Sequence, residues 1–272
     1  MQLAAAMDVP APGPELAALF ELAPELVEWS VNSVSDPRGT LRVSAWSRDR
    51  WRAARALELL APDQTSIREL LVDAEEYEGL GLALRSGELP TVRWWSFASE
   101  GRAMAERARA AWPAHAAMID ELFATVGTED ACTAVGLESS GGHQRETVYA
   151  RLRDAATAIR VLELARVQVS RAANLFWKGL CGLEENGRTW PKVWVGRSIG
   201  AHPGWKFYYF ARSDELRRSD EVLLAAVEAG PELQASWQVL RAAVPDQPCI
   251  QLIGLTIPDG LPPAFTVYLG RV

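Results

Sequence analysis

The chain has 272 residues, of which 49% are hydrophobic and 23% are charged, and its mean hydropathy is −0.05. These values are typical of a globular protein with ample material for a core, and they exclude a disordered chain. The net charge of −7 and the pI near 5.2 argue against a nucleic-acid-binding surface, which needs a clustered basic excess.

The same reading excludes several other classes. The first residues lack the basic region of a signal peptide, and no apolar run approaches the ~20 residues that a transmembrane helix needs. Cys132, Cys181 and Cys249 are far apart and have no CxxC partner, which argues against a disulfide framework and against a zinc site. We therefore expect a cytoplasmic protein with no membrane span and no protein-bound metal.

Five pairs of strand-like segments, each pair joined by turn residues, recur along the chain. In order, they are 25–34 with 40–47, 78–85 with 91–98, 131–138 with 146–152, 191–200 with 205–212, and 249–257 with 264–272. Segments of helical periodicity precede or separate them at 13–25, 48–76, 99–125, 153–180 and 213–243. Ser99 and Ser213 stand where N-caps are expected. The order helix, strand, strand therefore repeats about five times.

Alternation along the second strand of each hairpin separates two faces. One face is apolar and suits packing against helices. The other repeats a polar or cationic residue followed by an aromatic one: Arg42, Ser44, Trp46; Arg93, Trp95, Phe97; Thr147, Tyr149, Arg151; Lys206, Tyr208, Phe210; Thr266, Tyr268. In the first strands, Glu28, Lys192, Trp194 and Gln251 fall on this second face, although Ile253 then shares the face of Gln251.

About ten strands are near the limit for an open sheet, and closure removes exposed edges. The sequence therefore predicts an α+β fold in which about five αββ repeats form a closed ten-stranded antiparallel barrel surrounded by helices. We expect a single domain over residues 1–272. Its interior would be polar and aromatic, and wide enough to hold a ligand.

Several cations aimed into one cavity imply an anionic guest, because buried charge is costly unless it is neutralised. Arg42, Arg93, Lys192 and Lys206 are these cations, unless some of them pair with carboxylates such as Glu28 or Glu138 or lie in water at the rim. A diphosphate suits such a site, and aromatic faces beside it would stabilise a carbocation. Glu28 is then either a general base for an aromatic acceptor or only an ion-pair partner of Arg42.

The αββ order, the absence of a DDxxD metal motif and the polar-x-aromatic pattern resemble the ABBA aromatic prenyltransferases. This resemblance implies transfer of a prenyl group, with Glu28 contacting the acceptor and Arg42 binding the diphosphate. Lys206 with Tyr208 is similar to the Lys-x-Tyr pair of the family, in which Lys binds phosphate and Tyr shields the cation, and Lys192 with Trp194 is a variant of it. The resemblance also implies a diphosphate contact from Gln251, and shielding by Tyr149 and Tyr268. The cationic and aromatic strand face adds Arg93 to the expected diphosphate ligands and Trp95 to the shielding or stacking residues.

The short chain, which ends just after its last strand, is more similar to the bacterial enzymes that prenylate peptides, including the cyanobactin group. The implied donor is dimethylallyl or a longer prenyl diphosphate. The implied acceptor is an indole (Trp) or Tyr of a peptide or a small natural product. The resemblance implies no protein-bound cofactor and allows Mg²⁺ to accompany the diphosphate. The alternative is a non-catalytic barrel, or a tandem ferredoxin-like protein, that binds a hydrophobic anion.

Overall fold

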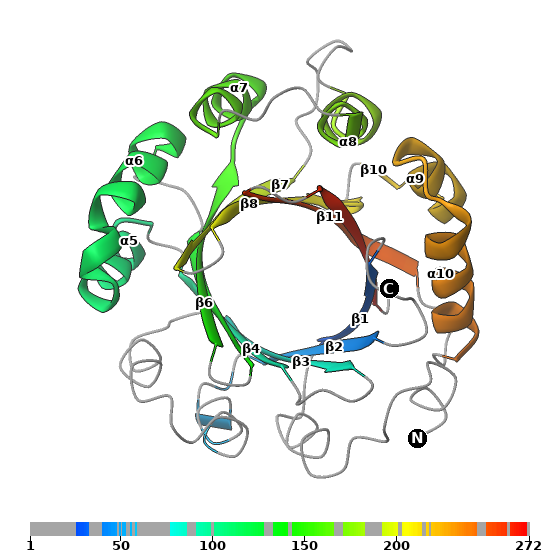
Figure 1. The fold of residues 1–272 in the computed structure, drawn as a ribbon, viewed down its shortest axis with the longest axis horizontal. Coiled ribbons are helices and arrows are strands. Elements are labelled where there is room, and N and C mark those ends of the chain that lie inside the picture. Colours follow the sequence, from blue (N-terminus) through cyan, green and yellow to red (C-terminus); the bar gives the residue numbers. More distant parts are fainter. Residues whose placement is uncertain are drawn as a thin grey trace.

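Ten strands close into one antiparallel barrel in the order β1-β12-β11-β8-β7-β6-β5-β4-β3-β2 (Figure 1). The computed structural model describes residues 26–32, 40–47, 49, 51–52, 55, 58, 77–85, 91–98, 101–127, 133–140, 143–165, 171–182, 192–200, 203–213, 216–217, 219–243, 249–259 and 262–270. The barrel strands are β1 (Leu26–Asn32), β2 (Thr40–Ser47), β3 (Tyr77–Arg85), β4 (Thr91–Ala98), β5 (Thr133–Ser140), β6 (His143–Leu152), β7 (Val193–Gly200), β8 (Gly204–Phe210), β11 (Cys249–Pro258) and β12 (Ala264–Gly270).

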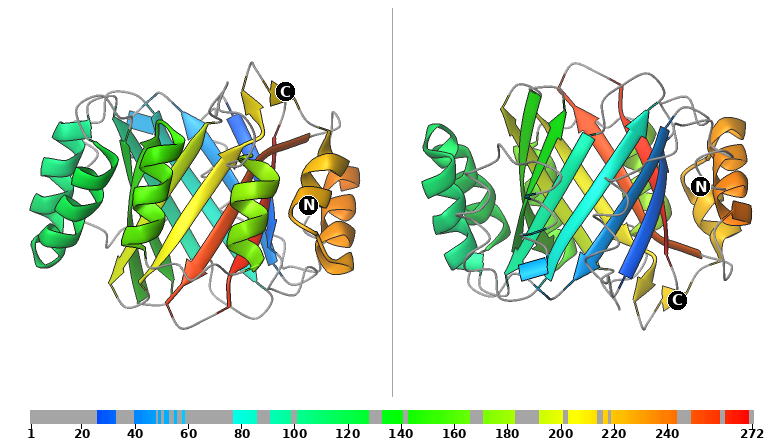
Figure 2. Two further views of the ribbon diagram at one scale, coloured as in Figure 1. Left: turned by 90° about the horizontal axis from the view of Figure 1, so that it is seen from above. Right: turned by 90° about the horizontal axis from the view of Figure 1, so that it is seen from below.

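All five expected hairpins are confirmed. In each, the two strands pair antiparallel, as in β1 with β2 and β3 with β4. Closure comes from the pairing of β1 with β12, in which Glu28 lies opposite Gly270. The strands cross the barrel wall diagonally in side view (Figure 2). The expected fold class, a closed ten-stranded antiparallel barrel surrounded by helices, is therefore confirmed.

Helices lie around the outside of the barrel (Figure 1). They are α5 (Gly101–Ala111), the short η1 (Pro113–His115), α6 (Ala116–Val126), α7 (Ala155–Leu164), α8 (Arg171–Asn174), η2 (Leu175–Leu180), α9 (Asp220–Ala226) and α10 (Pro231–Ala243). Proline at the first position of η1 separates α5 from α6, because its ring cannot continue a helix. The helix expected at 13–25, most of the one at 48–76 and the expected N-cap Ser99 lie outside the described residues.

The expected N-cap at Ser213 is wrong. Arg212–Ser213 form the short strand β9, which pairs with β10 (Leu216–Arg217). Helix α9 instead follows Ser219, whose Oγ accepts the backbone N–H of Val222 at 3.4 Å. The sequence offers two serines before this helix, and strand pairing takes up the first of them.

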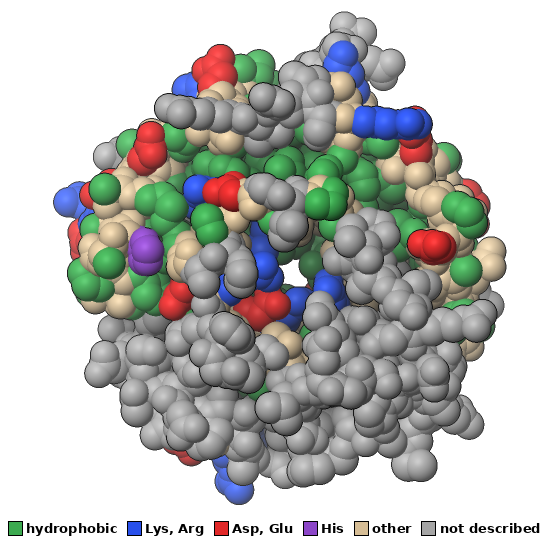
Figure 3. All heavy atoms as spheres, in the orientation of Figure 1, with side chains coloured by type: hydrophobic (Ala, Val, Ile, Leu, Met, Phe, Trp, Pro, Cys, Tyr) green, Lys and Arg blue, Asp and Glu red, His purple; other side chains and the backbone are tan. Residues whose placement is uncertain are grey.

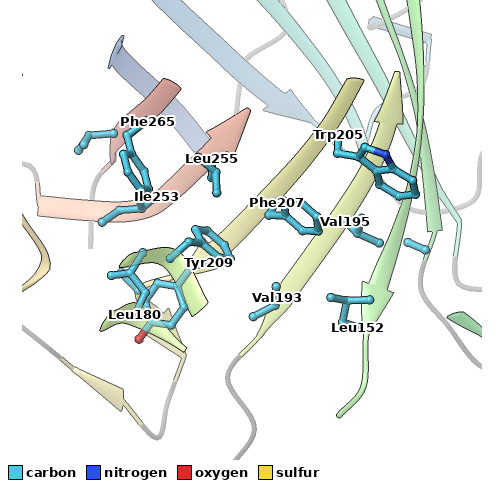
Figure 4. Packing of buried hydrophobic residues seen from close by; sticks show 14 of the residues in the cluster. Leu152, Leu180, Val193, Val195, Trp205, Phe207, Tyr209, Ile253, Leu255 and Phe265 are labelled. Carbon is cyan, nitrogen blue, oxygen red and sulfur yellow. The ribbon is translucent and has the colours of Figure 1, made fainter. Parts of the chain in front are cut away.

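The apolar strand face packs against the helices and forms the main core (Figure 4). Phe207 on β8 is fully buried, and its ring centroid lies 5.2 Å from that of Trp177 and 6.1 Å from that of Phe176 on η2. Each side chain of this size that leaves water contributes about 2 kcal/mol. A slip of one residue would expose the whole face, so packing fixes which residues point into the lumen.

A β-bulge in β11 explains why Ile253 breaks the expected alternation. The register shifts between Ile250 and Leu252, so that Gln251 is the extra residue. Beyond the bulge, Leu252 lies opposite Tyr268 and Ile253 is fully buried in the main core. Strict alternation along the sequence would put Leu252 on the helix-facing side together with Ile250, and this expectation is wrong, because the bulge exchanges the two faces.

Candidate functional site

Four cationic side chains lie near the starts of successive even-numbered strands: Arg42 on β2, Arg93 on β4, Arg145 on β6 and Lys206 on β8. These four barrel strands run in the same direction, so their starts meet at the end of the barrel that carries the hairpin turns. Blue and red side chains gather in the hollow at the centre of the face in Figure 3. We call these four residues the cationic cluster.

Lys206 is 8% exposed and lies within the electrostatic field of the other three cations. Burial lowers the pKa of Lys206 well below its usual value, and Arg145 and the other two arginines lower it further, while Glu138 raises it. Its Nζ donates to the Thr147 hydroxyl at 3.3 Å. An anion bound here would favour the charged ammonium, so the site is poised to bind one.

Glu138 on β5 lies between two of the arginines. Arg93 is directly opposite it on β4, and Arg145 is directly opposite it on β6. Its Oε1 accepts a hydrogen bond from Arg93 Nη2 at 3.2 Å, and its Oε2 accepts one from Arg145 Nη2 at 2.6 Å. Burial would by itself raise the pKa of Glu138, but the surrounding cations hold it well below its usual range. One ionised carboxylate is thus surrounded by Arg93, Arg145 and Lys206.

A belt of tyrosines lies beside the cationic cluster. The ring centroid of Tyr208 is 6.0 Å from that of Tyr149 and 6.1 Å from that of Tyr268. Burial raises the pKa of all three phenols, so they are neutral. Lumen-facing glycines make room for the rings: a Cβ on Gly196 would lie 2.7 Å from the ring of Tyr149, and one on Gly254 would lie 3.1 Å from that of Tyr208. The tyrosine rings therefore lie directly against the strand backbone, at positions where a side chain would collide with them.

The rest of the lumen is lined by tryptophan and phenylalanine. Trp46 stacks on Trp95 with 5.3 Å between the ring centroids. Trp46 and Phe97 form an edge-to-face pair with 5.4 Å between their ring centroids. Phe97 in turn contacts Trp194 at 5.5 Å, and Trp194 lies 6.5 Å from Phe210. Trp46, Trp95, Phe97 and Phe210 follow the cations along β2, β4 and β8, and Trp194 joins them from β7, so the lumen has one cationic end and one aromatic end.

Glu28 on β1 lies between the two ends. Ser30, two residues further along β1, is opposite Arg42, whereas Glu28 is opposite Ser44, toward the aromatic end. The indole Nε1 of Trp46 donates a hydrogen bond to Glu28 Oε2 at 2.9 Å. Burial raises the pKa of Glu28 to about 7, although the hydrogen bond from Trp46 acts to lower it. A carboxylate with this pKa suits proton transfer near neutral pH.

Two predicted diphosphate ligands, Lys192 and Gln251, lie elsewhere. Trp194 is opposite Tyr208, which puts Lys192 beyond them, with its Nζ 4.5 Å from the ring centroid of Phe210. Lys192 is four residues, or roughly 13 Å along β7, from the residue opposite Lys206. Neighbouring strands run in opposite directions, so the same Lys-x-aromatic pattern puts its lysine at opposite ends of the lumen. Gln251 lies on the bulge, and its Nε2 contacts the Cys249 Sγ at 3.1 Å.

The structure brings together the predicted residues Glu28, Arg42, Arg93, Lys206, Trp95, Tyr149, Trp194, Tyr208 and Tyr268 around one lumen. Sequence reasoning missed Arg145, because it assigned that residue to the hairpin turn. Extending the alternation from Thr147 by one step back would have found it. The contact between Trp46 and Glu28 depends on side-chain packing and leaves no signal in the sequence.

Among the described residues, no group of three or more His, Cys, Asp or Glu side chains could hold a metal ion. None of the helices in the described part of the chain is long and apolar enough to cross a membrane.

Comparison with solved structures identifies the fold. The 5-dimethylallyltryptophan synthase from Streptomyces coelicolor superposes with a TM-score of 0.72 and 16% identity, over 98% of this chain and 94% of that chain. A 6-dimethylallyl tryptophan synthase gives a TM-score of 0.72 and 15% identity, over 100% of this chain and 95% of that one. The prenyltransferase PriB, in a complex with L-tryptophan and dimethylallyl thiolodiphosphate, gives 0.68 and 17%, over 98% and 93%.

No protein-family profile and no curated relative match the sequence. At these identities the structural likeness establishes the fold. The chain has the barrel fold of the ABBA aromatic prenyltransferases, as the pattern of the sequence predicted.

Proposed function

We propose that the protein is an aromatic prenyltransferase that transfers a dimethylallyl or longer prenyl group from its diphosphate to an electron-rich aromatic acceptor. One observation carries the proposal: a carboxylate with a pKa of about 7 shares the lumen with four cations, and tyrosine rings lie beside them. The cations suit the leaving group, the rings suit a carbocation and the carboxylate suits the proton that the acceptor must lose.

The diphosphate binds the cationic cluster in this proposal. Arg42, Arg93 and Arg145 offer planar guanidinium donors, and Lys206 offers an ammonium group that an anion would keep protonated. When the C–O bond of the prenyl diphosphate breaks, both electrons leave with the diphosphate. Preorganised cations stabilise the charge that develops on this leaving group. We assign no diphosphate contact to Lys192 or Gln251, since both lie toward the aromatic end.

The prenyl cation then lies against the faces of Tyr149, Tyr208 and Tyr268, which stabilise it without capturing it. Their raised pKa values keep the phenols neutral, so they are weak nucleophiles. A ring atom of the acceptor attacks the cation and forms the new bond. The proton that the acceptor loses goes to Glu28. The electron pair of the broken C–H bond stays in the acceptor ring and restores the aromaticity of that ring.

The acceptor in this proposal is an indole, either free tryptophan or tryptophan within a peptide, and a tyrosine is the next choice. Trp46, Trp95 and Phe97 offer stacking faces beside Glu28. The names of two fold neighbours, the dimethylallyl tryptophan synthases, state that those proteins make prenylated tryptophan. The cyanobactin-like preference for peptides remains a hypothesis that peptide acceptors will test.

The test has two steps. Calorimetry with dimethylallyl thiolodiphosphate, with and without Mg²⁺, measures donor binding, and mass spectrometry then measures transfer from dimethylallyl diphosphate to L-tryptophan, tryptophan peptides and tyrosine peptides. We expect Arg145→Ala and Lys206→Ala each to weaken donor binding at least tenfold, since each removes a charge-assisted contact. Arg160→Ala, on the surface of α7, is the control. Tight binding without any product would favour a non-catalytic binding protein, and no binding would refute the proposal.

A further inference from the structure

Glu138 is an acidic side chain in direct contact with the cationic cluster, so its charge opposes anion binding there. Its carboxylate bridges Arg93 and Arg145, and the cations around it keep it ionised. Neither arginine has another ion pair with a described residue, and the Nε atoms of both have no hydrogen-bond partner there. Each guanidinium group carries five N–H donors, so both retain donors that Glu138 does not use.

The pairing of β5 with β4 and β6 places Glu138 where a bound anion would approach it. Arg93, Glu138 and Arg145 lie directly opposite one another on three adjacent strands. The backbones of the two outer strands are roughly 10 Å apart, with Glu138 midway between them. A diphosphate that both arginines hold must therefore approach the carboxylate that lies between them.

We propose that Glu138 is a resident counter-charge: it neutralises Arg93 and Arg145 in the ligand-free barrel and weakens their hold on diphosphate, so that diphosphate is released after transfer. The inference rests on the proposed function, because it takes the cationic cluster as the diphosphate site. It assigns Glu138 a positioning role and no contact with the reacting carbon.

The charge count supports this role. With Lys206 protonated, four cations and Glu138 leave an excess of three positive charges. A prenyl diphosphate ester carries up to three negative charges. The cationic cluster together with Glu138 therefore matches the charge of the ligand, whereas the cluster without Glu138 would carry one positive charge more than the ligand neutralises. A bound diphosphate and Glu138 share the same two arginines and therefore compete for them.

A purely structural role makes the opposite prediction. If Glu138 served only to orient the two arginines, removing its charge would loosen them and weaken binding. If it is a counter-charge, Glu138→Gln removes a repulsion at short range and strengthens binding. For unit charges about 5 Å apart in a medium of intermediate polarity, that change corresponds to a dissociation constant about ten- to a hundredfold lower.

The experiment is calorimetric titration of the folded protein with inorganic diphosphate, at fixed ionic strength and without Mg²⁺. We expect Glu138→Gln to lower the dissociation constant at least tenfold, and to lower the melting temperature in the absence of ligand, because two arginines lose their partner. Glu146→Gln is the control, since it removes the same charge from the next strand position after Arg145, on the opposite face of β6. We expect it to leave the dissociation constant unchanged within twofold.

Equal or weaker binding by Glu138→Gln would overturn the inference and make Glu138 an orienting residue. If the wild-type protein does not bind diphosphate at all, the proposed function fails instead, so the two failures are distinguishable. Should Glu138→Gln not fold, the same substitution in an Arg145→Gln background restores the wild-type charge excess. Tighter binding by this double variant than by Arg145→Gln alone is the expected result, and equal or weaker binding would again overturn the inference.

Discussion

Replacing Glu28 by Gln should stabilise the protein at alkaline pH. The pKa of Glu28 is raised from the ordinary 4.5 to about 7, chiefly by burial. Between these two values the folded protein holds a proton that the unfolded chain has released, so the free energy of unfolding falls by about 1.4 kcal/mol for each pH unit. The loss therefore begins near pH 4.5, is complete just above pH 7 and amounts to about 3 kcal/mol.

Glutamine has no ionisable proton and stays neutral over this pH range, and its carbonyl oxygen can still accept the indole N–H of Trp46. Urea unfolding should therefore give Glu28→Gln and the wild type equal stability at pH 4.5, and an advantage of about 3 kcal/mol for the variant at pH 8. The same variant should lose most of its prenyl transfer while keeping donor binding. Glu146→Gln is the control for general charge effects. A stability difference that is the same at both pH values would refute a buried Glu28 carboxylate.

Two further substitutions test the lumen. Trp46→Phe removes the indole N–H, so the acidic limb of the pH profile of kcat/KM should move up by about one pH unit, because the neighbouring carboxylate becomes harder to ionise. Trp205→Phe, outside the lumen, should leave the acidic limb in place. If the limb does not move in either variant, the hydrogen bond from Trp46 to Glu28 does not control the ionisation of Glu28. Gly196→Ala puts a Cβ 2.7 Å from the ring of Tyr149 and should cost about 1–3 kcal/mol of unfolding free energy. Gly230→Ala, with nothing within 4 Å, is its control, and an equal effect of both would argue against the close packing at Tyr149.

Strand alternation accounts for how much of the site could be predicted. Arg42, Arg93 and Lys206 were assigned to the lumen because a strand places every second side chain on the same face. The apolar face, with Phe207 and Tyr209 buried against the helices, confirms that assignment. Arg145 was missed because strand ends are poorly marked in a sequence. The last three residue pairs of β5 with β6, which begin with Glu138 opposite Arg145, fall partly or wholly in the polar segment that reads as a turn.

The end of the lumen at which a side chain lies was harder to predict than the side of the sheet to which it belongs. Lys192-x-Trp194 and Lys206-x-Tyr208 share the same Lys-x-aromatic sequence pattern. They belong to strands that pair antiparallel, so their lysines lie toward opposite ends of the lumen. The bulge at Gln251 is likewise set by contacts distant in the chain. The N–H of Ile250 donates to Asp220 Oδ1 at 3.0 Å, an interaction that joins α9 to β11.

The sequence alone determined the five hairpins, the helices on one face and the polar-aromatic character of the other, because these depend on the local period of the chain. The tertiary structure decided which charges meet. The bridge from Glu138 to Arg93 and Arg145 spans three strands, and the contact of Trp46 with Glu28 requires the lumen to be closed around both. Burial in that lumen is also what raises the pKa of Glu28, because desolvation depends on every strand that surrounds the carboxylate.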